Sequence, residues 1–150
     1  MAGVGFTVDT GAVALTASTA KTIAQVIAAT NQRALIKRID ISSNGITPTD
    51  PGILVDILTQ TTAGTMTSLT PQKRTSSDTE TLQTTAQKTA TAEPTAGNTL
   101  FSFYYNEQTW VPIIFDPPLA VVGGTRMGVR ATPGTLTAAT NIVVTLDCEE

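Results

Sequence analysis

The sequence predicts an all-β protein, an antiparallel and jelly-roll-like β-sandwich, from three observations. Threonine makes up about a fifth of the residues, and Ser, Ala, Gly and Val make up much of the rest. β-Branched side chains lose rotamer freedom in a helix but pack well on a pleated sheet. Prolines and glycines interrupt the apolar segments at short intervals, and long runs of Leu, Glu and Lys are missing. Short strands separated by turn residues are typical of a sandwich or barrel.

Three segments in the first half of the chain predict strands. Residues 22–30 have enough alanine for a helix, but we favour a strand from the composition of the chain. Residues 53–60 form a second apolar segment, preceded by the turn sequence Asp-Pro-Gly. Residues 34–43 alternate most clearly. Their side chains divide into two faces, Leu35, Lys37, Ile39 and Ile41 on one and Ile36, Arg38 and Asp40 on the other.

Residues 61–99 are polar and rich in Thr, Gln, Ser and Ala. A loop of nearly 40 residues is unusual within a compact domain. We therefore expect a turn, a short strand, a charged loop and two edge strands here. Their ranges are residues 63–65 for the turn, 66–69 for the short strand, 71–78 for the loop, and 81–85 and 89–92 for the edge strands.

Apolar strand patterns return in the last third of the chain. The segment around Pro112 should be an edge strand or carry a bulge, because proline has no N–H to donate to a neighbouring strand. With the earlier segments, this makes about eight strands at a spacing typical of two antiparallel sheets. The late strands are expected at residues 100–105, 109–115, 126–131 and 141–148.

The N-terminal residues 1–18 are small, rich in Gly and Ala and almost uncharged. We expect them to form an extended arm that becomes ordered against a neighbouring subunit. A frayed terminus is the alternative. The single β-sandwich domain then spans residues 19–150.

The charge of the chain argues against several classes of partner. The formal net charge is −3 and the isoelectric point is about 4.8, so the chain lacks the basic field that binds nucleic acid or an anionic membrane. No segment approaches the roughly 20 apolar residues that cross a bilayer, and the N-terminus lacks the pattern of a signal peptide. We expect synthesis and retention in the cytoplasm of the producing cell until assembly.

Catalytic and metal-binding patterns are weak. The chain has no histidine, the commonest general base and metal ligand, and its one cysteine, Cys148, cannot form an intramolecular disulfide. Asp78 and Glu80 have the spacing of an acid pair but sit in a polar loop, and no acidic group matches a calcium-binding loop. Lys73 and Lys88 lie near Ser and Thr without any nucleophile motif. We expect no enzyme, no cofactor, no metal and no small-molecule substrate.

Five of the seven aromatic residues fall between Phe101 and Trp110. On a strand, Phe101, Phe103 and Tyr105 share one face, which we assign to the core. Tyr104 and Trp110 are candidate interface anchors, because such side chains combine a large contact area with a polar group. Carbohydrate stacking on these rings is the rival role. The candidate interface combines the apolar residues of the arm with the two anchors, namely Val4, Phe6, Val8, Tyr104 and Trp110.

Several segments together resemble a family of small structural proteins of tailed bacteriophages. The resemblance covers most of the chain from Leu15 onward, with Gln-Thr-Thr-Ala-Gly and Thr-Ala-Glu-Pro-Thr-Ala-Gly as its most recognisable phrases. It implies a virion protein with a jelly-roll-like or related sandwich fold that decorates or cements a capsid, and it carries over no site residues. The segments are LTASTAKTIAQVIAATNQRALIKRIDIS, LTQTTAGTMTSLTP, SDTETLQTTAQKTATAEPTAG, FDPPLAVVGGTRMGVRATP and LDCEE.

The leading hypothesis is therefore a capsid decoration protein on the virion exterior, bound between major capsid subunits and to copies of itself. Trimers would follow from a place on the threefold positions of an icosahedral shell. A second hypothesis is a tail or fibre component that binds a receptor or a glycan. A carbohydrate-active enzyme using Asp78 and Glu80 is the third and weakest.

Overall fold

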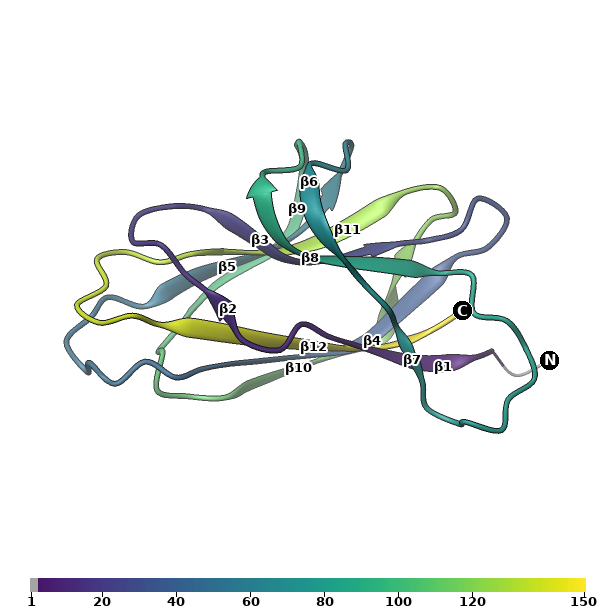
Figure 1. Ribbon diagram of the computed structural model, residues 1–150, viewed down its shortest axis with the longest axis horizontal. Helices are drawn as coiled ribbons and strands as arrows, with labels where there is room; N and C mark the ends of the chain where they lie inside the picture. The colour runs from purple at the N-terminus through teal and green to yellow at the C-terminus, as the bar shows by residue number, and fades with distance from the viewer. Residues whose placement is uncertain (1–2) are drawn as a thin grey trace.

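Twelve antiparallel strands and no helix make up the part of the chain that the structure, a computed structural model, describes, which is residues 3–150. They form two sheets that pack face to face (Figure 1), so the predicted β-sandwich is confirmed. Sheet A runs in the order β10 (Val111–Val121), β4 (Ala34–Ser43), β12 (Asn141–Glu149), β1 (Gly5–Asp9) and β7 (Gln72–Lys73), with β2 (Val13–Ala14) also paired to β12. Sheet B runs in the order β6 (Thr65–Leu69), β8 (Thr85–Ala92), β3 (Lys21–Ile27), β11 (Arg126–Thr132), β5 (Ile53–Gln60) and β9 (Ala96–Tyr105).

The core lies between the two sheets and follows the alternation of the strands. In β12, every second residue is buried and the residues between them are half-buried. This pattern places Ile142, Val144, Leu146 and Cys148 against sheet B. Burial of large aliphatic side chains on both inner faces is the main source of stability in such a sandwich.

β4 departs from the strict alternation that the sequence predicts. Its pairing with β12 changes register between Ile36 and Arg38, so Lys37 is an extra residue in a β-bulge. As a result, Ile36, Ile39 and Ile41 are all fully buried, although alternation alone puts Ile36 on the opposite face from the other two. A bulge changes the face of every residue beyond it, and the sequence pattern does not mark its position.

The N-terminal segment is a strand of the domain and not an extended arm. β1 lies between β12 and β7, and it pairs with β12 from Gly5 to Asp9. Phe6 and Val8 are fully buried in the core, because alternation turns both toward sheet B. The expected boundary at residue 18 is therefore corrected, since β1 and β2 are strands of sheet A, to which β4, β10 and β12 also belong.

The polar segment contributes one edge of sheet B. β6 is the edge strand and β8 lies next to it, so the expected edge strands at residues 81–85 and 89–92 are a single strand that begins at Thr85. The expected charged loop contains the short strand β7. Strand pairing here provides hydrogen bonds for the backbone N–H and C=O groups of a segment that has little apolar periodicity.

The ends of β6, β8 and β9 rise away from sheet B as a protrusion, visible at the top of Figure 1. β8 leaves the sheet at Thr89, which has a positive φ of 55°. The turn between β5 and β6 and the turn between β8 and β9 lie side by side, since the Thr61 N–H donates to the Thr95 carbonyl at 2.9 Å.

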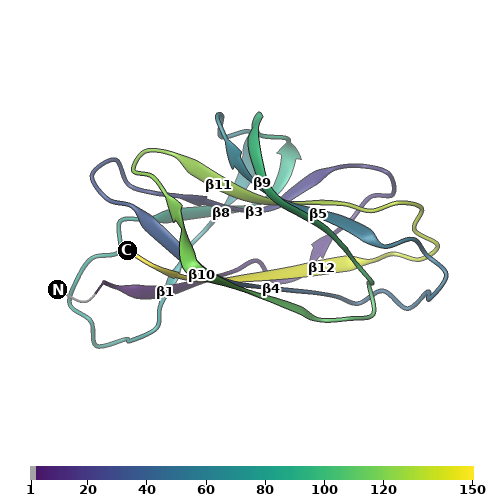
Figure 2. The same ribbon diagram turned by 180° about the vertical axis from the view of Figure 1, so that it is seen from behind.

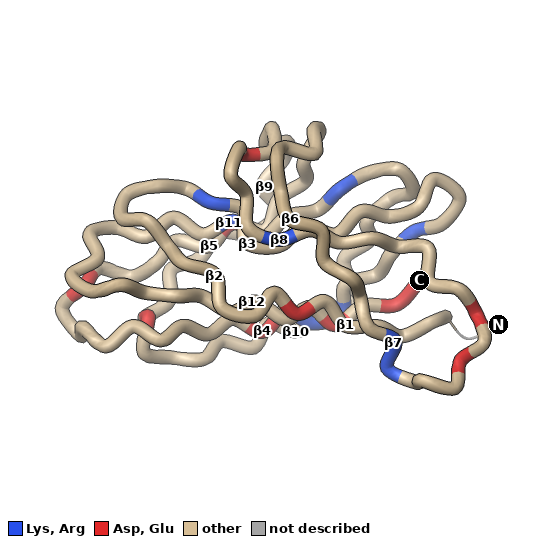
Figure 3. Tube along the Cα trace, viewed as in Figure 1, with Lys and Arg blue, Asp and Glu red and all other residues tan. Residues whose placement is uncertain are grey.

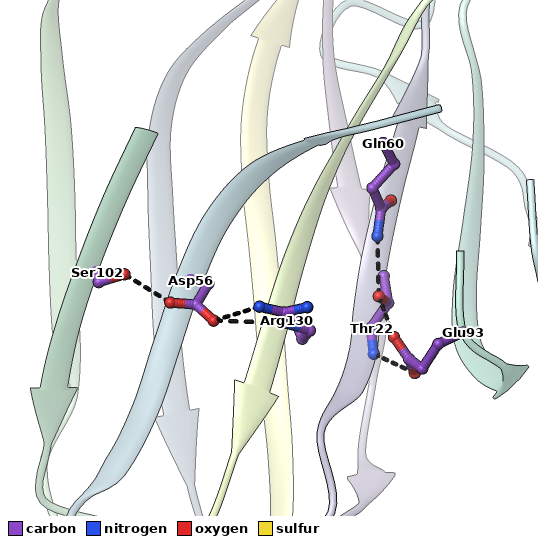
Figure 4. Close-up of polar contacts among 6 residues, drawn as sticks. All are labelled: Thr22, Asp56, Gln60, Glu93, Ser102 and Arg130. Atoms are coloured by element: carbon purple, nitrogen blue, oxygen red, sulfur yellow. Dashed lines mark hydrogen bonds and ion pairs between the residues drawn. The ribbon is translucent and has the colours of Figure 1, made fainter. Parts of the chain in front are cut away.

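A network of polar side chains ties this protrusion to β3 (Figure 4). Glu93, in the turn after β8, accepts hydrogen bonds from the Thr22 N–H at 2.8 Å and from the Thr22 hydroxyl at 2.7 Å. Gln60 Nε2 donates to the same hydroxyl at 2.9 Å, and Gln60 Oε1 accepts from Gln25 Nε2 at 2.6 Å. Thr22, Gln25 and Gln60 are buried, so these bonds replace the water that burial removes.

Candidate functional site

β9 and β10 are the edge strands of the two sheets on one side of the sandwich, the side shown in Figure 2. Within residues 3–150, β9 pairs only with β5, and β10 pairs only with β4. Each strand therefore has one row of backbone groups without a neighbouring strand. The short turn at residues 106–110 joins the two strands and keeps the two free edges together.

Exposed hydrophobic side chains gather on this side. Seven large hydrophobic side chains are exposed in the described chain, and five of them lie on β9, on β10 or in the turn between them. Tyr104 lies on the outer face of sheet B, whereas Trp110 and Ile114 lie on the outer face of sheet A, so these side chains flank the two edges. Several exposed hydrophobic residues along neighbouring free edges indicate an interaction surface, whereas single ones are ordinary. We call it the β9–β10 edge surface, and it consists of Leu100, Phe101, Tyr104, Trp110 and Ile114.

Two aromatic contacts hold parts of this surface in place. The ring of Phe101 on β9 packs against the ring of Phe115 on β10, with 5.5 Å between ring centroids and 51° between ring planes. The Arg38 guanidinium lies 5.7 Å from the ring centroid of Trp110, and its Nη2 also forms an ion pair with Asp40 at 2.7 Å. An exposed cation–π contact contributes about 0.5–1 kcal/mol.

The two edges differ in how well they are protected. β10 contains Pro112, Pro117 and Pro118, and its pairing with β4 is interrupted between Ile114 and Leu119. The prediction that Pro112 lies on an edge strand is confirmed. Proline and irregularity are common devices against unwanted strand pairing. β9 has no proline and no charged residue, so its free edge lacks these devices.

Polar contacts fix the edge strand β9 to its neighbours. The Ser102 hydroxyl donates to Asp56 Oδ1 on β5 at 2.6 Å, and Arg130 Nη2 on β11 donates to Asp56 Oδ2 at 2.8 Å (Figure 4). Burial raises the pKa of Asp56, but the hydrogen bonds from Ser102 and Arg130 and the charge of Arg130 outweigh it, so the pKa is lowered. These contacts link β9 to β5 and, through Asp56, to Arg130 on β11.

A second set of contacts holds the β9–β10 turn. Glu107 is buried, and its carboxylate accepts bonds from the Thr47 N–H and the Thr140 hydroxyl, each at 3.2 Å. The Ser43 hydroxyl donates to the Glu107 carbonyl at 2.6 Å. Burial raises the pKa of Tyr105, the last residue of β9, to about 12. The contacts of Glu107 fix the position of the turn between β9 and β10.

The structure divides the interface residues expected from the sequence into two groups. Tyr104 and Trp110 are 73% and 59% exposed, as expected of candidate anchors. Val4, Phe6 and Val8 are buried in the protein's own core, so the expectation that they face a partner is corrected. Their alternation, which marks a strand, was the signal against an exposed arm.

Sequence reasoning missed three residues of the surface, Leu100, Phe101 and Ile114. Phe101 was assigned to the core but is 48% exposed, because β9 is an edge strand with a register shift beside Leu100. Ile114 was expected in a strand and lies on the outer side of β10. The proline in β10 was the one available signal, since it marks an edge where side chains are less covered.

Three of the residues considered for catalysis, Lys73, Asp78 and Glu80, lie close together in one loop region. Asp78 and Glu80 lie in the loop after β7, where their backbone carbonyls accept bonds from Lys73 Nζ at 2.9 and 2.6 Å. Among residues 3–150, no three Cys, Asp or Glu side chains lie together in a metal-binding arrangement. Charged residues are scattered over the protein (Figure 3).

None of the described segments is a helix of the length and apolarity needed to span a membrane. No protein family matches the sequence, and no curated protein or solved structure matches it.

Proposed function

We propose that this protein is a non-enzymatic structural protein of a tailed-bacteriophage virion, which decorates the capsid and binds neighbouring protein subunits through the β9–β10 edge surface. The observation that carries the binding surface is the exposure of five hydrophobic side chains along two adjacent free edges and the turn between them. The phage assignment rests on the resemblance of the sequence segments quoted above.

The chemistry of the surface suits a protein partner. A free strand edge offers backbone hydrogen bonds, and alternate side chains of the strand offer pockets or knobs. Tyr104 and Trp110 are the kind of large, semi-polar side chains that dominate binding energy when a partner removes them from water. The absence of charge on β9 makes its edge easier to desolvate than a charged edge.

The proposed partners are the major capsid protein and further copies of this chain. On an icosahedral shell, a modest contact is repeated at every equivalent position, so a small surface on each copy can stabilise the whole particle. Trimers on threefold positions are one arrangement consistent with this proposal. The protein would be made in the host cytoplasm and end on the capsid exterior.

A binding experiment tests the proposal. Purified protein is added to shells of the encoding phage assembled without it, and the bound fraction is measured by sedimentation. We expect Trp110→Ser and Tyr104→Ser to lower binding at least tenfold, as loss of an interface anchor does. Val122→Ser is the matched control, because Val122 is 64% exposed but lies outside the surface. Equal binding by all variants would contradict this use of the edge.

The alternative is a tail or fibre component that binds a receptor or glycan. The exposure of Tyr104 and Trp110 favours it, because exposed aromatic rings stack on sugars. Electron microscopy of the virion separates the two proposals by the position of the protein. Density on the tail, with the two aromatic residues facing outward, would replace the capsid assignment.

A further inference from the structure

A cavity lies on the side of the sandwich opposite to the β9–β10 edge surface. Its volume is about 690 Å³, which is within the range of small-molecule sites. Its walls come from residues 68–73, where the chain crosses from β6 to β7, and from residues 79–87, which lead into β8. Ile27 on β3 also lines it. The cavity is an open cleft bordered by the segments through which the chain passes between the two sheets.

The wall of this cavity has an apolar part and a polar part. Leu69 and Leu82, both half-buried, pack against the main core and also line the cavity. Lys73 and Thr84 line it as well. A site of this kind binds the apolar part of a ligand over a large area and orients it by a few polar groups.

The Lys73 ammonium group is held in place but is not neutralised. It donates two hydrogen bonds, to the carbonyls of Asp78 and Glu80 at 2.9 and 2.6 Å. An ammonium group has three N–H donors, so one remains without a partner among the described residues. None of the described carboxylates lies within 4.0 Å of it, whereas four other basic side chains have such a partner. A fixed positive charge with a free donor favours an anion.

A second polar group is also without a partner. Thr84 is only 2% exposed, and its hydroxyl is buried without a hydrogen bond. The Gln87 side-chain oxygen is likewise buried and unpaired. Neither oxygen is accessible to solvent, so neither faces the cavity, and Lys73 is the basic side chain that lines it.

We propose that this cavity binds a small amphipathic carboxylate, of the class of medium-chain fatty acids. The carboxylate accepts a hydrogen bond from the Lys73 ammonium, and the hydrocarbon chain lies against Leu69 and Leu82. Glu80 also lines the cavity with an exposed side chain, so water weakens but does not abolish its repulsion of the ligand. This site is independent of the proposed virion function and of the β9–β10 edge surface.

Titrations with sodium octanoate and with 1-octanol, followed by ¹H–¹⁵N NMR on the full chain, test the proposal. We expect octanoate to shift the amide signals of residues 68–87 in a saturable way and to bind about tenfold more tightly than 1-octanol, since a hydrogen bond to a charged group contributes about this much. Shifts from octanoate that do not saturate, equal affinity for the alcohol, or shifts confined to β9 and β10 would overturn it.

Substitutions separate the charge from general hydrophobic binding. Lys73→Met should lower the affinity for octanoate to that for 1-octanol, whereas Lys21→Met is the matched control. Lys21 also donates to a backbone carbonyl, that of Ala14 at 2.7 Å, but does not line the cavity. Glu80→Gln should tighten octanoate binding, because it removes a like charge. This variant tests the role of charge if Lys73→Met does not fold. Full octanoate binding by a folded Lys73→Met, or unchanged affinity in Glu80→Gln where Lys73→Met does not fold, would refute the role of charge.

Discussion

The ring of Phe101 contacts the ring of Phe115, and this pair joins the edge strand of one sheet to the edge strand of the other. Phe115 is buried, while Phe101 is 48% exposed. The same side chain thus closes the core and forms part of the β9–β10 edge surface.

Phe101→Ala should lower the free energy of unfolding by about 1–2 kcal/mol, because an aromatic pair contributes about 0.5–1.5 kcal/mol beyond its buried area. Tyr104→Ala is the control, since Tyr104 is 73% exposed and should change stability by less than about 0.5 kcal/mol. Urea denaturation measures both. Equal effects of the two substitutions would mean that the ring contact does not join the sheets.

Phe6→Ala should lower the free energy of unfolding by about 3–5 kcal/mol, the usual cost of removing a buried aromatic ring. Phe6 is fully buried in β1, so deletion of residues 1–12 should prevent stable folding. Thermal unfolding followed by circular dichroism tests both changes. An intact unfolding transition after the deletion would instead support the extended arm that the sequence predicts.

Asp56→Asn should destabilise the protein by about 1–3 kcal/mol at neutral pH, because it weakens hydrogen bonds to a buried carboxylate and leaves Arg130 without its counterion. Asp40→Asn, which removes a more exposed ion pair with Arg38, should cost less than about 1 kcal/mol. Urea denaturation at pH 7 compares the two variants.

The effect of Asp56 should depend on pH in one direction. The pKa of Asp56 is lower in the folded protein than in the unfolded chain, so its ionised form stabilises the fold above the unfolded pKa of about 3.9. This stabilisation is lost as the pH falls through the folded pKa. The difference in unfolding free energy between wild type and Asp56→Asn should therefore shrink below about pH 4, and a constant difference down to pH 2 would contradict this.

Cys148 should be inert in the folded protein. Burial and the charge of Asp147 raise the pKa of its thiol to about 12, so almost no thiolate forms at pH 8. Ellman's reagent should react with it at pH 8 only after unfolding in guanidinium chloride. Rapid reaction of the native protein would show that the end of β12 opens readily.

Local patterns determined much of the fold from the sequence. The strands at residues 34–43 and 53–60 were predicted at the bounds that β4 and β5 have, because alternation and turn residues act within a few positions of the chain. The edge position of β10 was predictable from Pro112, since a missing N–H restricts where a strand can pair. Tyr104 and Trp110 were predicted as interface anchors, Tyr104 from strand alternation and both from their large, partly polar side chains.

Long-range pairing decided the rest. The bulge in β4, the place of β1 between β12 and β7, and the exposure of Phe101 all depend on which strands lie beside them. Composition could not distinguish a small, uncharged arm from a central strand, because both are extended and the difference is the partner. The sequence by itself determined that the chain forms two packed sheets of threonine-rich strands. Only the tertiary structure decided which edges stay free, because strand neighbours are set by contacts between residues far apart in the chain.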